Sequence, residues 1–366
     1  MPRITVGVPV YKGADLLPKA LECLRGQTFR DFEAIISVDG NDSETAAVCR
    51  PFLADSRFRM VVHSDRLDWV GNFNWLLQQD LQEFFCYRQH DDTTAPEFFE
   101  ALIRVADKEP GAAAIYCDCK YSGGRSDVEA ALSIKGDSPL DRMFQYVARL
   151  PNLMPTPVRG LIRSAAIRQA GLVRADEFRA ALQLLGWLAN VLRWGDFTRV
   201  PQPLYYRLDH ARSYTREFWT GAYKNAWTTI FTGLLDAAMR VCRTPAERQF
   251  FQQLVLDRVV AYPGFQRNDD AHFAHELGKA CLMRLEQEGR PDLLDGMLAA
   301  LDQLQERVAV LRSIERTRVG RAVSQARQNY RFARVAYVGS PGRRIDYQIR
   351  HLAELAGKAA RLLGNS

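Results

Sequence analysis

Two adjacent carboxylates, Asp91 and Asp92, follow a run of four apolar residues, Phe84 to Tyr87. The apolar run predicts a buried strand, and the carboxylates then lie in the loop at its carboxyl end. Open α/β sheets bind ligands beyond the carboxyl ends of their strands, and carboxylate oxygens are the donors that Mg²⁺ or Mn²⁺ prefers. Two surface acids on a solvated loop would give the same local pattern, so the rest of the chain must decide between a metal site and a plain loop.

The three strands predicted before this one also end in residues that could contact a ligand. Pro9 and Tyr11 lie at the end of the first strand, Asp39 at the end of the second, and Arg66 just after the third. The carboxyl ends of parallel strands share one edge of a sheet, so these residues can form one site. An aromatic ring such as that of Tyr11 can stack on a nucleotide base, and the guanidinium of Arg66 can face a diphosphate. Asn74 lies in the middle of a predicted helix, where Asn is a poor helix former, which favours a polar role. Each residue taken singly also fits a structural position, and the convergence of strand ends carries the interpretation.

The elements that would position these residues alternate at intervals of about 25 residues over the N-terminal third of the chain. Strands are predicted over residues 4–10, 31–38, 58–63, 84–87 and 112–121, and helices over 14–25, 43–53, 69–79 and 96–106. This alternation predicts an α/β fold with a mostly parallel sheet and helices on both faces. Short strands at 158–162, 197–200 and 204–207 and helices at 163–170 and 176–194 would complete a first domain over 1–214. Amphipathic stretches then predict a helical domain with a basic tail over 215–366.

Composition narrows the class of protein. The chain has 366 residues, of which 47% are hydrophobic, and no apolar run long enough to cross a bilayer or to act as a signal peptide. The seven cysteines lack zinc-type spacing, and we expect reduced thiols in the cytoplasm. The net charge of +6 belongs to the tail, because residues 301–366 hold 13 Lys and Arg against 5 Asp and Glu. Such a tail fits a helix with a solvated face or contact with an anionic membrane surface, and we expect no nucleic-acid partner.

The order of these features resembles family 2 glycosyltransferases, which have the Rossmann-like GT-A fold. Five segments between about residues 3 and 215 carry the resemblance. They are VGVPVYKGADLLPKALECLRGQTFRDFEAIISVDG, SDRLDWVGNFNWLL, QHDDTTAPEFFEAL, GLIRSAAIRQAGLV and RVPQPLYYRLDHARSYT. The resemblance implies inverting transfer of a sugar from a nucleoside diphosphate sugar, such as a UDP-sugar, to an acceptor hydroxyl.

The resemblance also implies roles for individual residues. Asp39 would accept the N3–H of uracil, and Asp91 or Asp92 would bind an Mn²⁺ or Mg²⁺ ion that bridges to the diphosphate. His210 would add a ligand to the metal or the phosphate, although a structural histidine fits its position too. The chain departs from the family at Gln89, which stands where the first acid of the metal-binding motif is usual.

The catalytic base is the least defined residue. Gln183 and Leu184 stand where the family carries an acid pair, and neither can accept a proton. Asp176 and Glu177, at the start of the same predicted helix, are the nearest candidates, although acids in a first helical turn also suit the helix dipole. Asp118, on the predicted strand that comes after the acidic loop, is a further candidate.

Two functions therefore stay open. The first is a metal-dependent glycosyltransferase in cell-surface polysaccharide or glycan synthesis, with a nucleotide-sugar donor and a glycan, lipid-linked or other hydroxyl acceptor. We expect it in the cytoplasm, peripheral to the inner face of the membrane, with possible homo-oligomers through the helical region. The second is a catalytically weak or inactive module of the same fold that binds nucleotide sugars or supports assembly. A nucleotidyltransferase is disfavoured because the loop Tyr11 to Gly13 is too short to hold a triphosphate.

Overall fold

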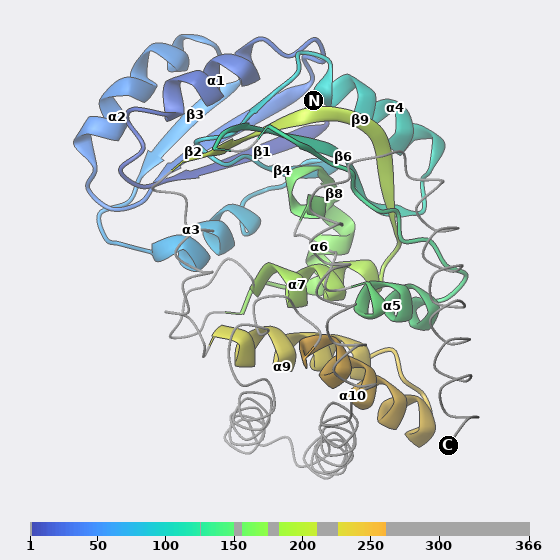
Figure 1. Ribbon diagram of the computed structural model, residues 1–366. Coiled ribbons are helices and arrows are strands. Elements are labelled where there is room, and N and C mark those ends of the chain that lie inside the picture. The colour runs from blue at the N-terminus through green and yellow to red at the C-terminus, as the bar shows by residue number, and fades with distance from the viewer. Residues whose placement is uncertain (1, 125, 150–155, 175–182, 211–225, 261–366) are drawn as a thin grey trace, which may run out of the picture. The chain divides into compact units, whose positions relative to one another are not determined.

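The structure of the protein is a computed structural model that describes residues 2–124, 126–149, 156–174, 183–210 and 226–260 (Figure 1). These residues all fall within Met1–Leu301, the first of the two units into which the chain divides; the second is Asp302–Ser366. The predicted basic tail and the helices expected beyond residue 260 lie outside the described residues, and the division of the chain at residue 214 stays a prediction.

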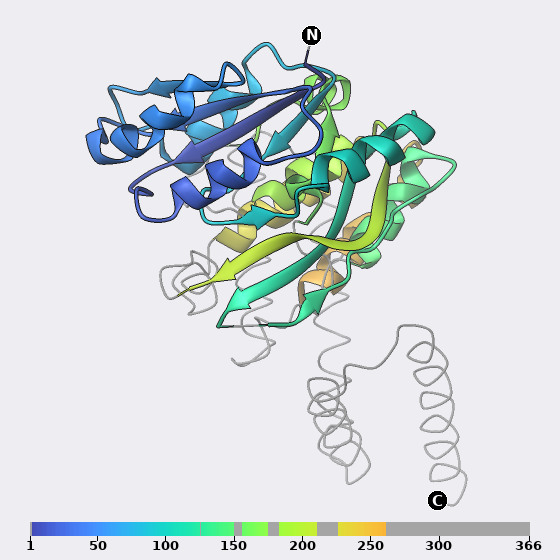
Figure 2. The ribbon, with the colours of Figure 1, turned by 90° about the horizontal axis from the view of Figure 1, so that it is seen from above.

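A single mixed sheet runs through the described unit in the order β3-β2-β1-β4-β8-β6-β9-β5, with β7 paired to β6. Its strands are β1 (Ile4–Val10), β2 (Phe32–Val38), β3 (Phe58–Val62), β4 (Phe84–Tyr87), β5 (Thr93–Thr94), β6 (Ala112–Gly123), β7 (Val128–Glu129), β8 (Leu161–Arg163) and β9 (Asp196–Asp209). The first four strands pair in parallel, as their alternation with helices predicted. Strands β5, β7 and β8 join antiparallel, whereas β6 and β9 are parallel and run side by side (Figure 2).

Helices cover both faces of the sheet, as expected (Figure 1). One apolar cluster contains side chains of α1 (Leu17–Arg25), α2 (Ser43–Cys49) and α4 (Phe98–Lys108). The other contains side chains of α3 (Asp68–Leu77), α5 (Pro139–Ala148), α6 (Ser164–Ala170), α7 (Gln183–Leu192), α9 (Ala226–Met239) and α10 (Pro245–Val260). In β4, Phe84 and Cys86 belong to the first cluster and Phe85 and Tyr87 to the second. This explains why β4 is apolar throughout, since a strand covered on both faces has no solvated side.

Two short 3₁₀ helices, η1 (Arg50–Ala54) and η3 (Thr156–Arg159), complete the described elements. The second occupies residues 158 and 159 of the stretch predicted as a strand at 158–162, and the strand β8 forms only over Leu161–Arg163. Gly160 follows η3 and lies so close to β6 that an added Cβ would overlap the carbonyl oxygen of Ile115. The close approach of η3 to the sheet therefore depends on a residue without a side chain.

The predicted strands at 197–200 and 204–207 form one strand, β9. Pro201 and Pro203 suggest a break, but they are exposed and lie where the register between β6 and β9 shifts between Cys117 and Cys119. A proline cannot donate a ladder hydrogen bond, and it is tolerated at an irregularity of this kind.

Helices α7 and α9 cross at two glycines. A Cβ added to Gly186 would lie 3.1 Å from the Cα atom of Gly233. The cluster on this face includes Trp187 and Leu188 of α7 and Leu234 of α9, so the two helices share one core. None of the helices among the described residues has the length and apolar composition needed to span a bilayer.

Candidate active site

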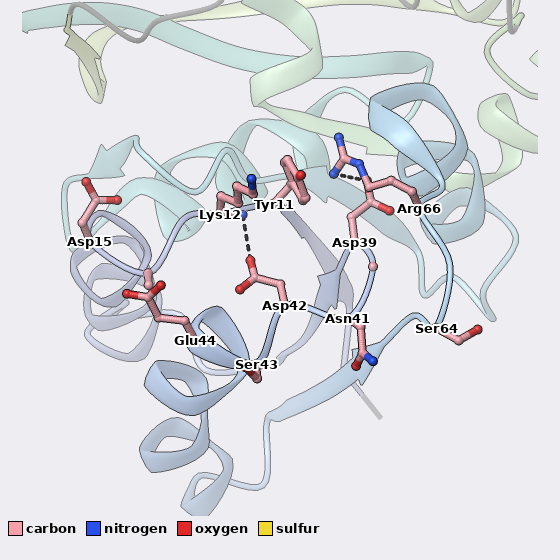
Figure 3. Close-up of a pocket in the computed structure, with 12 residues that line it drawn as sticks. Tyr11, Lys12, Asp15, Asp39, Asn41, Asp42, Ser43, Glu44, Ser64 and Arg66 are labelled. Atoms are coloured by element: carbon pink, nitrogen blue, oxygen red, sulfur yellow. Dashed lines mark hydrogen bonds and ion pairs between the residues drawn. The ribbon is translucent and has the colours of Figure 1, made fainter.

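An open cleft of about 740 Å³ lies at the carboxyl ends of β1 and β2 (Figure 3). It is lined by Tyr11, Lys12, Ala14, Asp15, Asp39, Gly40, Asn41, Asp42, Ser43, Glu44, Ser64 and Arg66. Three of the predicted site residues, Tyr11, Asp39 and Arg66, are therefore brought together, as the convergence of strand ends predicted.

Asp39 ends β2 and is only 2% exposed. Its Oδ1 atom accepts a hydrogen bond of 2.6 Å from the backbone N–H of Leu67, and its Oδ2 atom lies 2.9 Å from Nη1 of Arg66. The carboxylate is thus fixed by the loop that leads into α3. A carboxylate has about four lone-pair positions, so it can accept a further N–H from a ligand in the cleft.

Tyr11 and Arg66 stack on one another. The guanidinium carbon of Arg66 lies 3.2 Å from the ring centroid of Tyr11, whose side chain is 41% exposed. Arg66 therefore lies at the Tyr11–Asp39 end of the cleft. A flat base can stack at this position only beside the guanidinium or after displacing it.

Asp42 closes the floor of the cleft. It accepts a hydrogen bond from the backbone N–H of Lys12 at 2.8 Å (Figure 3). It also accepts one from the backbone N–H of Thr45 at 3.1 Å, and so caps α2. Burial by itself would raise the pKa of this carboxyl, but the bonds from Thr45 and Lys12 outweigh it and lower the pKa below 3.8. Lys12 adopts a left-handed conformation, with φ of 49°. Asp42 therefore has a structural role as the N-cap of α2.

The acidic loop after β4 meets the cleft at Gly13. A Cβ on Gly13 would stand 2.8 Å from the ring of His90, the residue before Asp91. In the loop, Oδ2 of Asp91 lies 3.1 Å from Nε2 of His210, which comes directly after β9. Residues from two distant segments, as predicted, therefore meet beside the cleft.

Asp92 has a different environment from Asp91. It is 3% exposed, and its oxygens accept hydrogen bonds from the Tyr205 hydroxyl at 2.9 Å and the Leu208 backbone N–H at 3.1 Å. Burial, together with the neighbouring charge of Asp91, raises the pKa of Asp92. The geometry therefore favours Asp91 over Asp92 as a ligand for a cation.

Gln89 and Arg159 make a contact that the sequence did not suggest. The Oε1 atom of Gln89 accepts a hydrogen bond of 3.1 Å from Nε of Arg159, whose side chain is 6% exposed. The same Nε atom is 3.8 Å from Oδ2 of Asp92. Arg159 of η3 thus lies next to Gln89, the residue that replaces the first acid of the motif.

The donor set fits a divalent ion that arrives with a diphosphate. Magnesium-like ions are commonly held by one or two protein ligands plus substrate phosphates. Asp91 and His210 supply one carboxylate oxygen and one imidazole nitrogen. No group of three or more His, Cys, Asp or Glu side chains suited to a metal occurs in the described part of the chain, so the protein atoms there offer a partial rather than a complete cage.

Two other predicted residues lie in the framework. Pro9 is buried in β1 opposite Ser37 of β2. Asn74 exchanges two hydrogen bonds with the backbone of Val173, at 2.7 and 2.8 Å, and is not among the residues that line the cleft. The helix position that faces the strand ends is instead Asn72, which bonds to Ser37.

The candidates for the base are only partly visible. Asp176 and Glu177 lie outside the described residues. Asp118 is held by Arg199 through two bonds of 2.7 Å and also accepts the backbone N–H of Ala131. Its oxygens are therefore already engaged by donors of the framework. Leu184, where the family carries an acid, is buried in the core.

Comparison with known proteins identifies the fold and the family. Residues 5–167 match glycosyl transferase family 2. This range contains β1 to β4, the cleft and the acidic loop.

The chain carries a family 2 glycosyltransferase domain.

Curated relatives of this glycosyltransferase domain agree with the assignment. The chain is 26% identical over 153 residues to the GalNAc(5)-diNAcBac-PP-undecaprenol beta-1,3-glucosyltransferase of Campylobacter jejuni, a match that covers 41% of this chain and 49% of that protein. It is 24% identical over 231 residues to the putative glycosyltransferase EpsH of Bacillus subtilis, covering 59% and 64% respectively. The chain thus spans about half the length of the Campylobacter relative.

Among solved structures, S. aureus TarS 1-349 in complex with UDP-GlcNAc superposes with a TM-score of 0.59 at 13% identity. The superposition covers 84% of this chain and 92% of that one. At this identity the likeness shows the fold alone, and it is the GT-A fold expected for the glycosyltransferase domain.

Sequence reasoning missed Arg159 and Tyr205, which build the wall of the acidic loop in this domain. Tyr205 was part of a matched segment, but nothing in its neighbourhood signalled a bond to Asp92. Arg159 is 70 residues from Gln89 in sequence, and an arginine before a glycine resembles any surface turn. Only the chemical mismatch at Gln89 could have prompted a search for a partner.

Proposed function

We propose that the protein transfers a sugar from a nucleoside diphosphate sugar, a UDP-sugar, to an acceptor hydroxyl with inversion at the sugar carbon. The observation that carries the proposal is the cleft in which Tyr11 and Asp39 stand together at the strand ends, with the acidic loop touching it at Gly13. An aromatic face, a buried acceptor and a nearby carboxylate match the base, the base N–H and the diphosphate of such a donor.

The base is proposed to bind at Tyr11. The pyrimidine stacks on the ring, with the Arg66 guanidinium moving aside or stacking with it, and its N3–H is donated to Asp39. UDP as the nucleotide is supported by the structural neighbour S. aureus TarS, which is in complex with UDP-GlcNAc. Arg66 is 40% exposed and pairs with Asp39 and Asp68, and to face the diphosphate it would turn away from these carboxylates.

Asp91 and His210 would hold an Mn²⁺ or Mg²⁺ ion. Such an ion, when bound, neutralises the charge that develops on the departing nucleoside diphosphate. Asp92 keeps the loop in place through Tyr205 and Leu208, and so orients Asp91 toward the diphosphate.

Asp176 and Glu177 are proposed as the source of the catalytic base. In an inverting transfer the base takes the proton of the acceptor hydroxyl while the oxygen attacks the sugar carbon. The bond from that carbon to the diphosphate oxygen breaks on the opposite side, and the nucleoside diphosphate leaves with its electron pair.

The acceptor is proposed to be a glycan or lipid-linked intermediate of cell-surface polysaccharide synthesis. The name of the Campylobacter relative contains an undecaprenol diphosphate-linked glycan, which supports this class. The excess of Lys and Arg in residues 301–366 would then favour contact with anionic lipid at the inner face of the membrane. Residues 215–366 are also the proposed site of self-association.

A thermal-shift panel of nucleotides and sugar nucleotides, with and without Mn²⁺, tests the proposal. UDP or a UDP-sugar should stabilise the protein in Mn²⁺, and hydrolysis or transfer should follow and disappear in Asp91→Ala. Stabilisation without turnover of any donor would instead support the binding module, which the replacement of acids by Gln89 and Gln183 favours. No stabilisation by any nucleotide would exclude both functions.

A further inference from the structure

Gln89 is the point at which this domain departs from the family pattern, and its surroundings explain how the site tolerates the change. It follows β4 by two positions, and its amide oxygen accepts a hydrogen bond from Arg159 of η3. The side chain of Arg159 is buried, so this contact lies inside the wall of the site and not on its rim.

The same guanidinium serves Asp92. Its Nε atom is 3.8 Å from Oδ2 of Asp92, and its carbon lies 5.9 Å from the ring centroid of Tyr205, the residue whose hydroxyl binds that oxygen. Arg159 therefore stands among three members of the loop wall: Gln89, Asp92 and Tyr205. Strands β4 and β9 are tied together through these contacts.

The choice of glutamine matters because of charge. A buried guanidinium needs a nearby negative group, and among the described residues the carboxylate of Asp92 lies 3.8 Å from it. A neutral amide at position 89 accepts the hydrogen bond without competing for this charge, whereas an aspartate would form its own ion pair with Arg159. Gln89 and Arg159 thus form a matched pair that leaves the charge of Asp92 compensated and that of Asp91 available.

We propose that Arg159 is a positioning residue of the donor site, which holds Gln89 and Asp92 so that Asp91 and His210 meet the metal–diphosphate. The proposal rests on the proposed function. In this proposal the loop tolerates glutamine in place of the first acid because Arg159 holds the side chains of Gln89 and Asp92.

The test compares Mn²⁺–UDP binding, by calorimetry and by the electron paramagnetic resonance signal of bound Mn²⁺, in matched variants of the full chain. Arg159→Met should weaken binding by about tenfold or more, as removal of groups that orient metal ligands commonly does. Arg159→Lys should recover part of the loss, because it keeps the charge but not the fixed fork of donors. The control Arg163→Met removes an arginine of β8 that contacts Glu83 and two backbone carbonyls, and it should change binding by less than about twofold.

Gln89→Leu is the second variant, used if Arg159→Met does not fold. It removes the amide acceptor from a half-buried side chain and should weaken Mn²⁺–UDP binding in the same direction, with the protein still folded. Wild-type affinity in folded Arg159→Met, or in Gln89→Leu when Arg159→Met is unfolded, overturns the positioning role while leaving the proposed function intact. Failure of the wild type to bind Mn²⁺–UDP overturns both.

Discussion

Asp39→Asn removes one charge from the cleft while keeping the shape of the side chain. If Asp39 accepts the N3–H of a pyrimidine, the change replaces a charged acceptor by a neutral one. A hydrogen bond to a charged group contributes about 1.5–3 kcal/mol, which corresponds to a loss of roughly 10- to 150-fold in affinity for UDP. The amide oxygen can still accept the N–H of Leu67, now at 2.6 Å from Oδ1, so the fold should survive.

A second effect opposes the first. Asp39 is paired with Arg66 in the free protein, and the ligand must share or break this pair. Arg66 is 40% exposed, so the pair contributes about 0–1 kcal/mol after solvent screening. Its loss in the variant returns at most that amount to binding, so the net expectation is a loss of about 0.5–3 kcal/mol, or roughly 2- to 150-fold in affinity.

Calorimetric titration of UDP into both proteins measures this difference. Asp55→Asn is the matched control, because Asp55 also pairs with an arginine, Arg57 at 2.6 Å, but does not line the cleft. It should bind UDP like the wild type. A folded Asp39→Asn protein whose affinity lies within less than about twofold of wild type would refute the reasoning, since the net effect would then be below about 0.4 kcal/mol.

Three further outcomes follow from the packing. Tyr205→Phe takes a donor from the buried carboxylate of Asp92 and should lower the free energy of unfolding in urea by about 1.5–3 kcal/mol; an unchanged value would mean that water replaces the hydroxyl. Gly160→Ala forces a methyl group against the backbone of β6 and should cost about 1–3 kcal/mol and weaken nucleotide binding, which urea unfolding and UDP titration would report; unchanged values of both would show that η3 can move away freely. The hydrogen bond from Arg57 lowers the pKa of Asp55 below 3.8, so above pH 5 the free energy of unfolding of the wild type should exceed that of Asp55→Asn by about 0.5–1 kcal/mol. This difference in stability should shrink as the pH falls below about 4, and a difference independent of pH would contradict this origin.

The sheet and the cleft were accessible to sequence reasoning because they depend on local patterns. Apolar runs marked the first four strands, and residues at strand ends such as Tyr11 and Asp39 had to meet once those strands were parallel. Where the pattern is not local, it misled or was silent. Residues 197–200 and 204–207 were predicted as two strands, with Pro201 and Pro203 between them. These prolines are tolerated within one strand because the register of the neighbouring strand β6 shifts beside them, and the sequence does not reveal that register.

The contacts that the sequence did not predict are mainly those between side chains and partners far apart in the chain. Asn74 looked like a ligand-binding residue because a polar group in a helix needs a partner, but that partner is the backbone of Val173, 99 positions away. Arg159 gave no signal at all. The contact between Arg159 and Gln89 arises only from tertiary packing. Arginine and glutamine are both residue types that usually lie on protein surfaces, so neither residue alone indicates a buried pair.

The crossing of α7 and α9 at Gly186 and Gly233 bears on how this protein can be divided. The matched family segment ends at residue 167, yet α7 completes its burial only against a helix that starts at Ala226. A shortened protein ending near residue 214 would expose the side of α7 around Gly186, against which α9 packs. We expect such a fragment to aggregate in expression trials, and useful truncations to retain residues through at least α10.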